Sequence, residues 1–265
     1  MKFLYAKSHI IAILVIFMAG SFSISNAQIR ESIEPPEMPA PKARTAYQEG
    51  LRTGFLGRVN LTDNGLGIGM ELRRVIAPYT EVMFGLEGSG LRDSREQIFN
   101  SYYFGQITPN KYRRVIALPL TVGFRQRLFA SAFDDNFRLN ISGQAGPTAA
   151  FVFPYFGDTN ENGIRDDNEM FYDVFRGWKS GELMFGGSGR LGIGIDFGDR
   201  FKRVTSFEFG YQFSYFADGI QIMQPNAYEL IFLPDGQIGV TIVEGADKQA
   251  FFGTPVITLS FGRFW

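Results

Sequence analysis

The side chains with the clearest potential for chemistry lie in one run of the chain, residues 158–169, which is rich in Asp, Asn and Glu. Oxygen-bearing groups occupy its first, third, fifth, seventh, ninth and twelfth positions, which is the spacing of a calcium-binding loop. Gly163 stands at the sixth position, where such a loop needs a sharp turn. The sequence therefore predicts that Ca²⁺ is a cofactor. The expected ligands, through side chains or through the isoleucine carbonyl, are Asp158, Asn160, Asn162, Ile164, Asp166 and Glu169.

The order of residues in this run departs from that of a helix-paired EF-hand. Its hydrophobic residue, Ile164, stands at the seventh position, and Arg165 stands at the eighth. In this respect the run resembles the calcium loops of dockerins, thrombospondin-type repeats and bacterial surface adhesins. The alternative interpretation is a solvated, acidic loop tip rich in turn-forming residues. If calcium binds, we expect it to stiffen an exposed loop rather than to support catalysis or signalling.

Side chains for enzymatic catalysis are scarce. The chain has no Cys, and its only His is His9, which lies in the expected leader segment. The mature chain therefore has no residues for Ser-His or Cys-His catalysis, for a thiolate metal site or for a His-ligated zinc site. We expect no enzymatic activity, and an enzyme built on carboxylates, Lys, Tyr or Ser alone is the remaining alternative.

Two N-terminal segments are expected to lie outside the folded domain. Residues 1–27 have a basic start, an apolar run and small residues before a cleavage site at Ala27, which indicates a secretory signal peptide. Residues 28–48 are rich in Pro and charge, which predicts a flexible periplasmic tail, with a short docking peptide as the alternative. Cleavage leaves 24 basic and 27 acidic residues, a net charge of −3 that gives no indication of nucleic-acid binding.

Apolar and polar residues alternate through most of residues 49–265. Phe207, Phe209 and Tyr211, for example, share one face of a segment whose other face includes Glu208. Alternating segments of about ten residues have the length of tilted transmembrane strands. The sequence therefore predicts an all-β fold, an eight-stranded antiparallel up-and-down transmembrane β-barrel. The expected strands cover 53–61, 66–74, 80–90, 114–128, 137–151, 183–197, 204–216 and 253–265.

The lengths of the connections agree with eight strands. With the N-terminus in the periplasm, the inward connections should be short turns, and they are: 77–79, a stretch near 134–136, and 198–202. The outward connections should be longer. Residues 62–65 form only a tight hairpin turn, but the other three are long: 91–113, 152–182 and 217–252.

A soluble barrel of the lipocalin type would show the same alternation, with its apolar face turned inward. Composition distinguishes the two. The mature chain has only five Lys, none within a strand core, whereas a solvated sheet face would carry several. Aromatic residues instead fill the apolar faces, and Tyr79, Tyr215 and Trp265 fall near strand ends, as in an aromatic girdle. These features favour a membrane barrel.

The final segment, 253–265, is apolar on one face and ends on Trp265, although Arg263 occupies a position where an apolar residue is usual. This ending resembles the closing strand of an outer-membrane β-barrel. Residues 50–265 as a whole resemble the small outer-membrane barrels of the OmpA/OmpX type, particularly those of Bacteroidota-like bacteria. The resemblance implies a bacterial outer-membrane location, contact with outer-membrane lipid and insertion by the barrel-assembly machinery. It also implies a structural, adhesion or interaction role with an extracellular or envelope protein partner.

An eight-stranded barrel has an interior just wide enough for side chains, so charged residues there need partners. Two interpretations of these charges remain, a structural salt-bridge core and a narrow, gated ion path. The charged residues expected to face the lumen are Arg58, Arg73, Arg125, Arg127, Arg138, Arg190, Glu71, Glu81, Glu87, Asp196 and Glu208.

Residues 228–243 form two β-rich runs around Asp235 and Gly236, which predicts a β-hairpin beyond the membrane. This hairpin either pairs with a partner through its edge or folds over the barrel mouth. Taken together, the sequence predicts a non-enzymatic outer-membrane barrel with a structural or surface-interaction role and a calcium-stabilised extracellular loop. A narrow-channel, porin-like transport barrel or a secretion-associated barrel is the alternative.

Overall fold

The structure, a computed structural model, describes residues 45–101, 105–130, 136–198, 201–232, 234 and 237–265. The expected signal peptide, 1–27, and most of the expected tail lie outside the described residues. Among those that are described, no helix is long and apolar enough to cross a bilayer.

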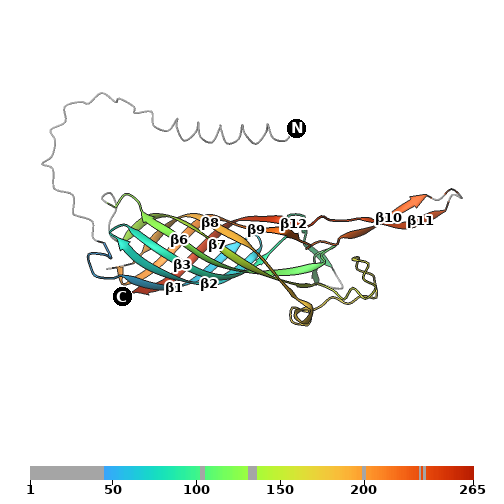
Figure 1. Cartoon of the computed structure of the whole chain (residues 1–265), viewed down its shortest axis with the longest axis horizontal. Helices are drawn as coiled ribbons and strands as arrows, with labels where there is room; N and C mark the ends of the chain where they lie inside the picture. The colour runs from blue at the N-terminus through green and yellow to red at the C-terminus, as the bar shows by residue number, and fades with distance from the viewer. Residues whose placement is uncertain (1–44, 102–104, 131–135, 199–200, 233, 235–236) are drawn as a thin grey trace, which may run out of the picture. The chain divides into compact units, whose positions relative to one another are not determined.

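Eight strands close into one ring (Figure 1). Each strand pairs antiparallel with its two neighbours, in the order β1-β12-β9-β8-β7-β6-β3-β2. Barrel strands that are consecutive in the chain are therefore neighbours in the ring. The predicted eight-stranded up-and-down barrel is confirmed. Its strands are β1 (Thr53–Thr62), β2 (Gly65–Ala77), β3 (Thr80–Leu91), β6 (Arg113–Arg127), β7 (Phe137–Pro154), β8 (Glu182–Phe197), β9 (Arg203–Ile220) and β12 (Gln249–Phe264).

The barrel is apolar outside and polar inside. In β9, Phe209 is 59% exposed, whereas the neighbouring Glu208 is 5% exposed. The same alternation runs through β2, where exposed Leu72 lies between buried Glu71 and Arg73. A soluble barrel would have the opposite arrangement, because water would face its outer surface. The fold is that of a transmembrane β-barrel, in which the outward side chains contact lipid instead of water.

The two ends of the barrel differ. At one end, which we call the turn end, short connections join β2 to β3, β6 to β7 and β8 to β9. The other end, which we call the loop end, has the tight turn at Asp63 and Asn64 and three long connections, as predicted. These contain the small sheet of β4 (Phe99–Ser101) and β5 (Gly105–Ile107), the short 3₁₀ helix η1 (Arg176–Ser180), and the hairpin of β10 (Asn226–Phe232) and β11 (Ile238–Glu244).

The chain enters the barrel through a turn packed at the turn end. Thr45 is 1% exposed, and its hydroxyl and carbonyl accept hydrogen bonds from the N–H of Gln48, a local cap for the turn that follows. Ala46 contacts the interior apolar residues of this end. Of the tail expected over 28–48, only residues 45–48 are described, and of these Thr45 and Ala46 are buried at the turn end.

The first and last strands close the ring. The main-chain N–H groups of Arg52 and Thr53 donate to the carbonyl of Trp265 at 3.0 and 3.1 Å, and Trp265 N–H donates to the Thr53 carbonyl at 2.8 Å. Phe55 and Arg263 face each other in the β1–β12 register. Closure leaves no free edge in the barrel sheet.

Phe209 lies near the middle of the lipid-facing belt, paired with Ile193 of β8 and Ile257 of β12. We expect Phe209→Arg to lower the free energy of unfolding by about 2–4 kcal/mol, since a charge near the bilayer midplane is costly. Urea titration of the barrel in lipid vesicles measures the change. Phe209→Leu, which keeps the surface apolar, should have a small effect, and an equal loss in both variants would contradict the lipid-facing assignment.

Candidate functional site

The middle of the lumen is filled by paired charges. Glu71 accepts hydrogen bonds from Arg58 Nη1 at 2.7 Å, Arg73 Nε at 2.6 Å and Gln144 Nε2 at 3.0 Å. Both arginines and the glutamate are at most 5% exposed. A carboxylate between two guanidinium groups satisfies most of its hydrogen-bonding capacity, which offsets the desolvation of all three charges.

Two further ion-pair groups occupy the same interior. Arg125 donates to Asp196 at 2.7 Å and to Glu208 at 3.2 Å. Arg190 donates to Glu87 at 2.9 Å and also to Gln212. The predicted lumen charges therefore face one another, as a structural salt-bridge core requires.

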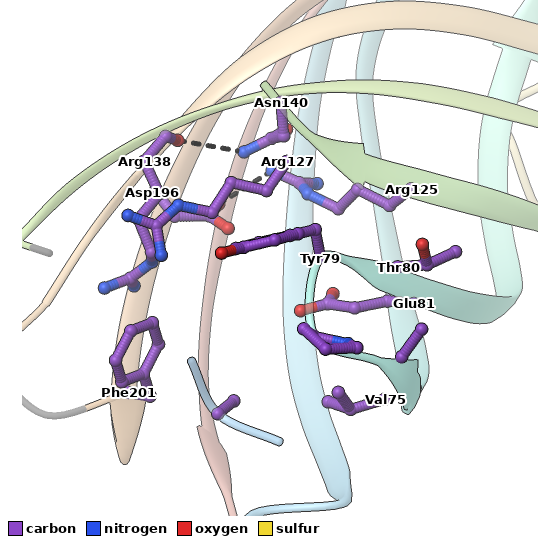
Figure 2. A pocket seen from close by; sticks show the side chains of 13 residues that line it. Val75, Tyr79, Thr80, Glu81, Arg125, Arg127, Arg138, Asn140, Asp196 and Phe201 are labelled. Atoms are coloured by element: carbon purple, nitrogen blue, oxygen red, sulfur yellow. Dashed lines mark hydrogen bonds and ion pairs between the residues drawn. The ribbon is translucent and has the colours of Figure 1, made fainter. Parts of the chain in front are cut away.

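The charges at the turn end are arranged more loosely (Figure 2). Glu81 lies 3.9 Å from Arg73, and Arg138 donates to the Gly198 carbonyl at 3.0 Å. The guanidinium of Arg138 also lies over the ring of Phe201, 4.6 Å from its centroid. The pocket that these residues line has a volume of about 40 Å³, enough for one or two water molecules.

Glycine makes room for the charged side chains. A Cβ on Gly192 would lie 2.7–2.9 Å from the carboxylate end of Glu208, and one on Gly85 would lie 2.9 Å from the hydroxyl of Thr121. The frequent glycines on the polar faces are therefore explained by close approach of side chains across a narrow interior.

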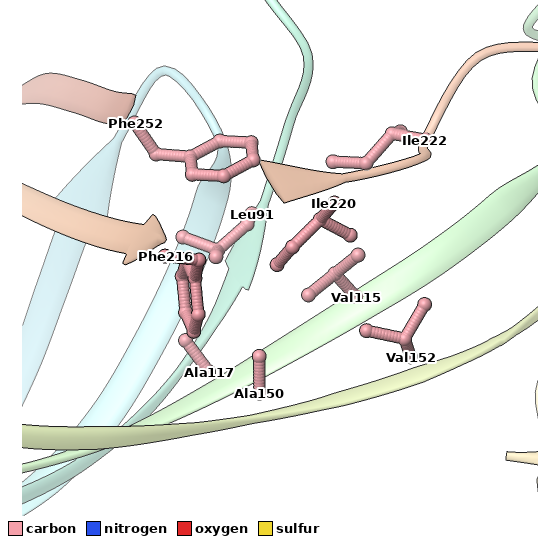
Figure 3. Packing of buried hydrophobic residues seen from close by; sticks show 9 residues of the cluster. All are labelled: Leu91, Val115, Ala117, Ala150, Val152, Phe216, Ile220, Ile222 and Phe252. Carbon is pink, nitrogen blue, oxygen red and sulfur yellow. The ribbon is translucent and has the colours of Figure 1, made fainter. Parts of the chain in front are cut away.

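Apolar clusters close the lumen on both sides of the charged layer. The loop-end plug (Figure 3) consists of buried side chains from five strands and from the start of the connection after β9: Leu91, Val115, Ala117, Ala150, Val152, Phe216, Ile220, Ile222 and Phe252. The turn-end plug consists of Ala46, Leu56, Val75, Phe201, Val204 and Phe264. Neither plug was expected from the sequence.

The plugs arise from the strands' own alternation. In β7 the inward positions run from Arg138 through Asn140 and Ser142 to Ala150 and Val152, so one face changes from charged to apolar toward the loop end. Every second side chain of β7 therefore still points inward, but these side chains change from polar to apolar along the strand. Another pocket within the lumen has a volume of only about 10 Å³.

Above the barrel, the predicted calcium-binding run folds back on itself. Asp158 accepts hydrogen bonds from the main-chain N–H of Asn162 at 3.1 Å and of Gly163 at 3.0 Å. Glu169, only 4% exposed, accepts from the N–H of Thr159 through Oε1 at 2.7 Å and from the N–H of Asp166 through Oε2 at 3.1 Å. The first and last predicted ligands thus organise the two halves of the loop.

The other predicted ligands lie in the same turn. Asn160 Nδ2 donates to Asp166 Oδ2 at 2.7 Å, and Asn162 Oδ1 accepts from the N–H of Ile164 at 2.7 Å. Gly163 has φ +72°, the left-handed conformation that the sharp turn needs. No group of three or more Asp, Glu, His or Cys side chains is placed to hold a metal ion within the described ranges. The donor set is chemically suited to calcium, which accepts neutral amide and carbonyl oxygens beside carboxylates.

This loop is fastened to the base of the β10–β11 hairpin, a contact that the sequence did not predict. Asn226 Nδ2 donates to the Asn162 carbonyl at 2.7 Å, and the Tyr228 hydroxyl donates to Asp166 Oδ1 at 2.9 Å. The hydrogen bond to Asp166 raises the pKa of Tyr228. Only the isolated turn signals of the two segments were visible in the sequence, since nothing in either one specifies the other as its partner.

A second polar cluster ties the connection after β3 to its neighbours. Arg95 pairs with Asp93 at 2.8 Å and donates to the Asp247 carbonyl at 2.6 Å, while Lys111 pairs with Glu96 at 2.7 Å. Burial would raise the pKa of Asp93, but the hydrogen bonds and charge of Arg95 outweigh it and hold that pKa below its ordinary value. The described contacts therefore tie the three long connections to one another, and we call this assembly of residues 93–96, 110–112, 158–169 and 224–228 the platform.

No protein-family model matches the chain, and no curated protein matches it. Several solved structures are similar. A major outer membrane protein from Thermus thermophilus aligns at 8% identity with a TM-score of 0.41, over 79% of this chain and 99% of that one. Ail, the attachment invasion locus protein of Yersinia pestis, aligns at 9% identity with a TM-score of 0.35, over 81% and 96%. The N-terminal β-barrel domain of Pseudomonas aeruginosa OprF aligns at 8% identity with a TM-score of 0.34, over 79% and 96%.

The filled lumen predicts that the barrel does not conduct ions. Purified protein inserted into a planar bilayer should give no current steps, because ion pairs and two apolar plugs occupy the interior. Insertion is checked in the same bilayer with fluorescently labelled protein. Steps that persist after the loop-end connections are shortened would contradict this and support the narrow-channel alternative.

Proposed function

We propose that this protein is a non-enzymatic outer-membrane barrel that serves surface interaction or envelope structure through its loop end. The observation that carries the proposal is the contrast between the two parts of the molecule. The lumen is filled along its length, whereas the loop end bears an ordered platform and an exposed hairpin. A barrel that offers no open interior acts through the surfaces that it presents.

Several features support an outer-membrane location. The expected signal peptide would direct export, and the closed barrel satisfies its backbone hydrogen bonds without water. Short turns at one end and long connections at the other match outer-membrane barrels, in which the long loops face outward. The loop end is accordingly assigned to the cell exterior.

The chemistry of the side chains supports a non-enzymatic role. The carboxylates of Glu71, Glu87 and Asp196 are held in ion pairs inside the lumen, and the pockets that Glu87 and Asp196 line among the described residues measure only about 10 and 40 Å³. The only His lies in the expected signal peptide. A general acid or base needs access to its substrate, which these carboxylates lack.

We further propose that calcium stiffens the loop 158–169. The carboxylates of Asp158, Asp166 and Glu169 and the amides of Asn160 and Asn162 supply oxygen ligands from one turn, with the Ile164 carbonyl as the sixth. Because Asp166 also accepts from Tyr228, the bound ion would steady the base of the hairpin together with the loop.

Placement of the loop end outside the cell is tested with single thiols, since the chain has no Cys. Lys179 in η1 and Lys202 at the turn end are both exposed. A membrane-impermeant maleimide should label Lys179→Cys on intact cells but should label Lys202→Cys only after the outer membrane is permeabilised. The reverse pattern would place the loop end in the periplasm and overturn the proposed surface role.

Calcium binding is tested by calorimetric titration of the refolded barrel in detergent. We expect saturable binding with a dissociation constant of about 0.1–1 mM, the range of extracellular calcium modules. Binding should be lost in the double variant Asp158→Ala, Glu169→Ala and retained in Asp167→Ala, which removes a carboxylate at a non-ligand position. Absence of saturable binding to the unaltered protein would reduce the motif to a polar loop.

A further inference from the structure

The hairpin of β10 and β11, which we call the ribbon, has large apolar side chains along one face, with Asn226 and Glu244 on that face at the base. The cross-strand register pairs Tyr228 with Ile242, Leu230 with Val240 and Phe232 with Ile238. Residues two apart share a face of a strand, so all six lie on the same side. The opposite side carries Ala227, Glu229, Ile231, Gly239, Thr241 and Val243.

The apolar face is turned to solvent. Its six side chains are 50–84% exposed, with Phe232 and Leu230, at 84% and 69%, the most exposed of the set. Figure 1 shows the ribbon extending beyond the barrel, away from the end where the C-terminus lies. The predicted alternative in which this hairpin folds over the barrel mouth is not what the structure shows.

A two-stranded ribbon is marginally stable by itself and gains stability when its apolar face is covered. An exposed apolar surface of this kind marks an interaction site. We propose that the occupant is a second copy of this chain in the same membrane. The two ribbons pack apolar face against apolar face about a two-fold axis along the membrane normal, as a four-stranded, two-layer sandwich outside the bilayer.

The surface available fits a dimer. At roughly 100 Å² of apolar surface for each large side chain, six side chains supply about 600 Å² per copy. Two copies then bury about 1,200 Å² in total, the lower edge of the range for specific interfaces. Copies in one membrane share their orientation and meet at a high effective concentration, so an interface of this size is sufficient.

Charge favours a second copy over a lipid surface. Residues 226–244 include no Lys or Arg, and their acidic residues are Glu229, Asp235 and Glu244. Anionic lipid head groups attract basic segments, not acidic ones. Glu229 lies on the opposite face, and Glu244 lies on the apolar face only at its base, paired with Asn226, so the six apolar side chains themselves bring no charge into the contact.

The base of the ribbon is fixed in a way that suits a symmetric contact. Asn226 and Tyr228 are held by the loop 158–169, and the N–H of Gly245 donates to the Pro225 carbonyl at 2.7 Å. A ribbon anchored at its base presents the same face in every copy, and a two-fold contact needs the same patch on both partners. The proposal goes beyond the proposed surface role and stands on the transmembrane fold, whether or not calcium binds.

Its test compares substitutions on the two faces of the ribbon in the full-length barrel. We expect the unaltered protein to sediment as a dimer in detergent and to show energy transfer between donor- and acceptor-labelled copies in vesicles. Leu230→Asp, on the apolar face, should weaken dimerisation at least tenfold, whereas Thr241→Asp, on the opposite face, should leave it unchanged. A monomer at every protein-to-lipid ratio, or equal effects of the two substitutions, would overturn the proposal.

A second measurement does not depend on a disruptive substitution. Val240→Cys and Thr241→Cys each introduce the single thiol of the chain, on opposite faces of β11. A short bismaleimide should cross-link two copies of the Val240→Cys protein efficiently and two copies of the Thr241→Cys protein poorly. Preferential cross-linking through Thr241→Cys, or protection of Val240→Cys only when a different envelope protein is added, would assign the ribbon to another contact and overturn the proposal.

Discussion

Eight strands closed into a ring leave an interior that only side chains can fill, and that geometric constraint shapes the rest of this molecule. Inward charges have little water to solvate them, so each must find a partner across the lumen. Glu71 lies between Arg58 and Arg73, and the space that such groups need comes from glycines on facing strands. At either end the same inward positions become apolar, and the polar interior is enclosed between two hydrophobic layers.

Much of this could be predicted from the sequence because the period of a strand is local. Alternation in residues such as Phe207, Glu208 and Phe209 defines both faces without knowledge of the partner strand. All eight strands lie where they were expected, although β7, β9 and β12 extend several residues further toward the loop end and β2 extends further toward the turn end. The near balance of positive and negative charges among the inward residues could also be predicted, since it depends only on which residue occupies each inward position.

What could not be predicted depends on which segments meet. The pairing of Arg190 with Glu87 joins β8 to β3 across the lumen, and no local pattern specifies that choice. The loop-end plug was missed because Ala150 and Val152 look like ordinary strand residues until the neighbouring strands converge on them. The contact of Tyr228 with Asp166 likewise depends on how two long connections approach each other.

The seam between β1 and β12 has a consequence for how the molecule comes into being. It joins the first barrel strand to the last, through bonds such as those between Thr53 and Trp265. Contacts between distant parts of a chain form slowly, and here the ring cannot close until its final strand has been made. Before closure the sheet has two unpaired edges and an exposed apolar outer face, both of which promote aggregation. The unclosed chain therefore stays exposed to aggregation until the seam forms and lipid covers its outer face.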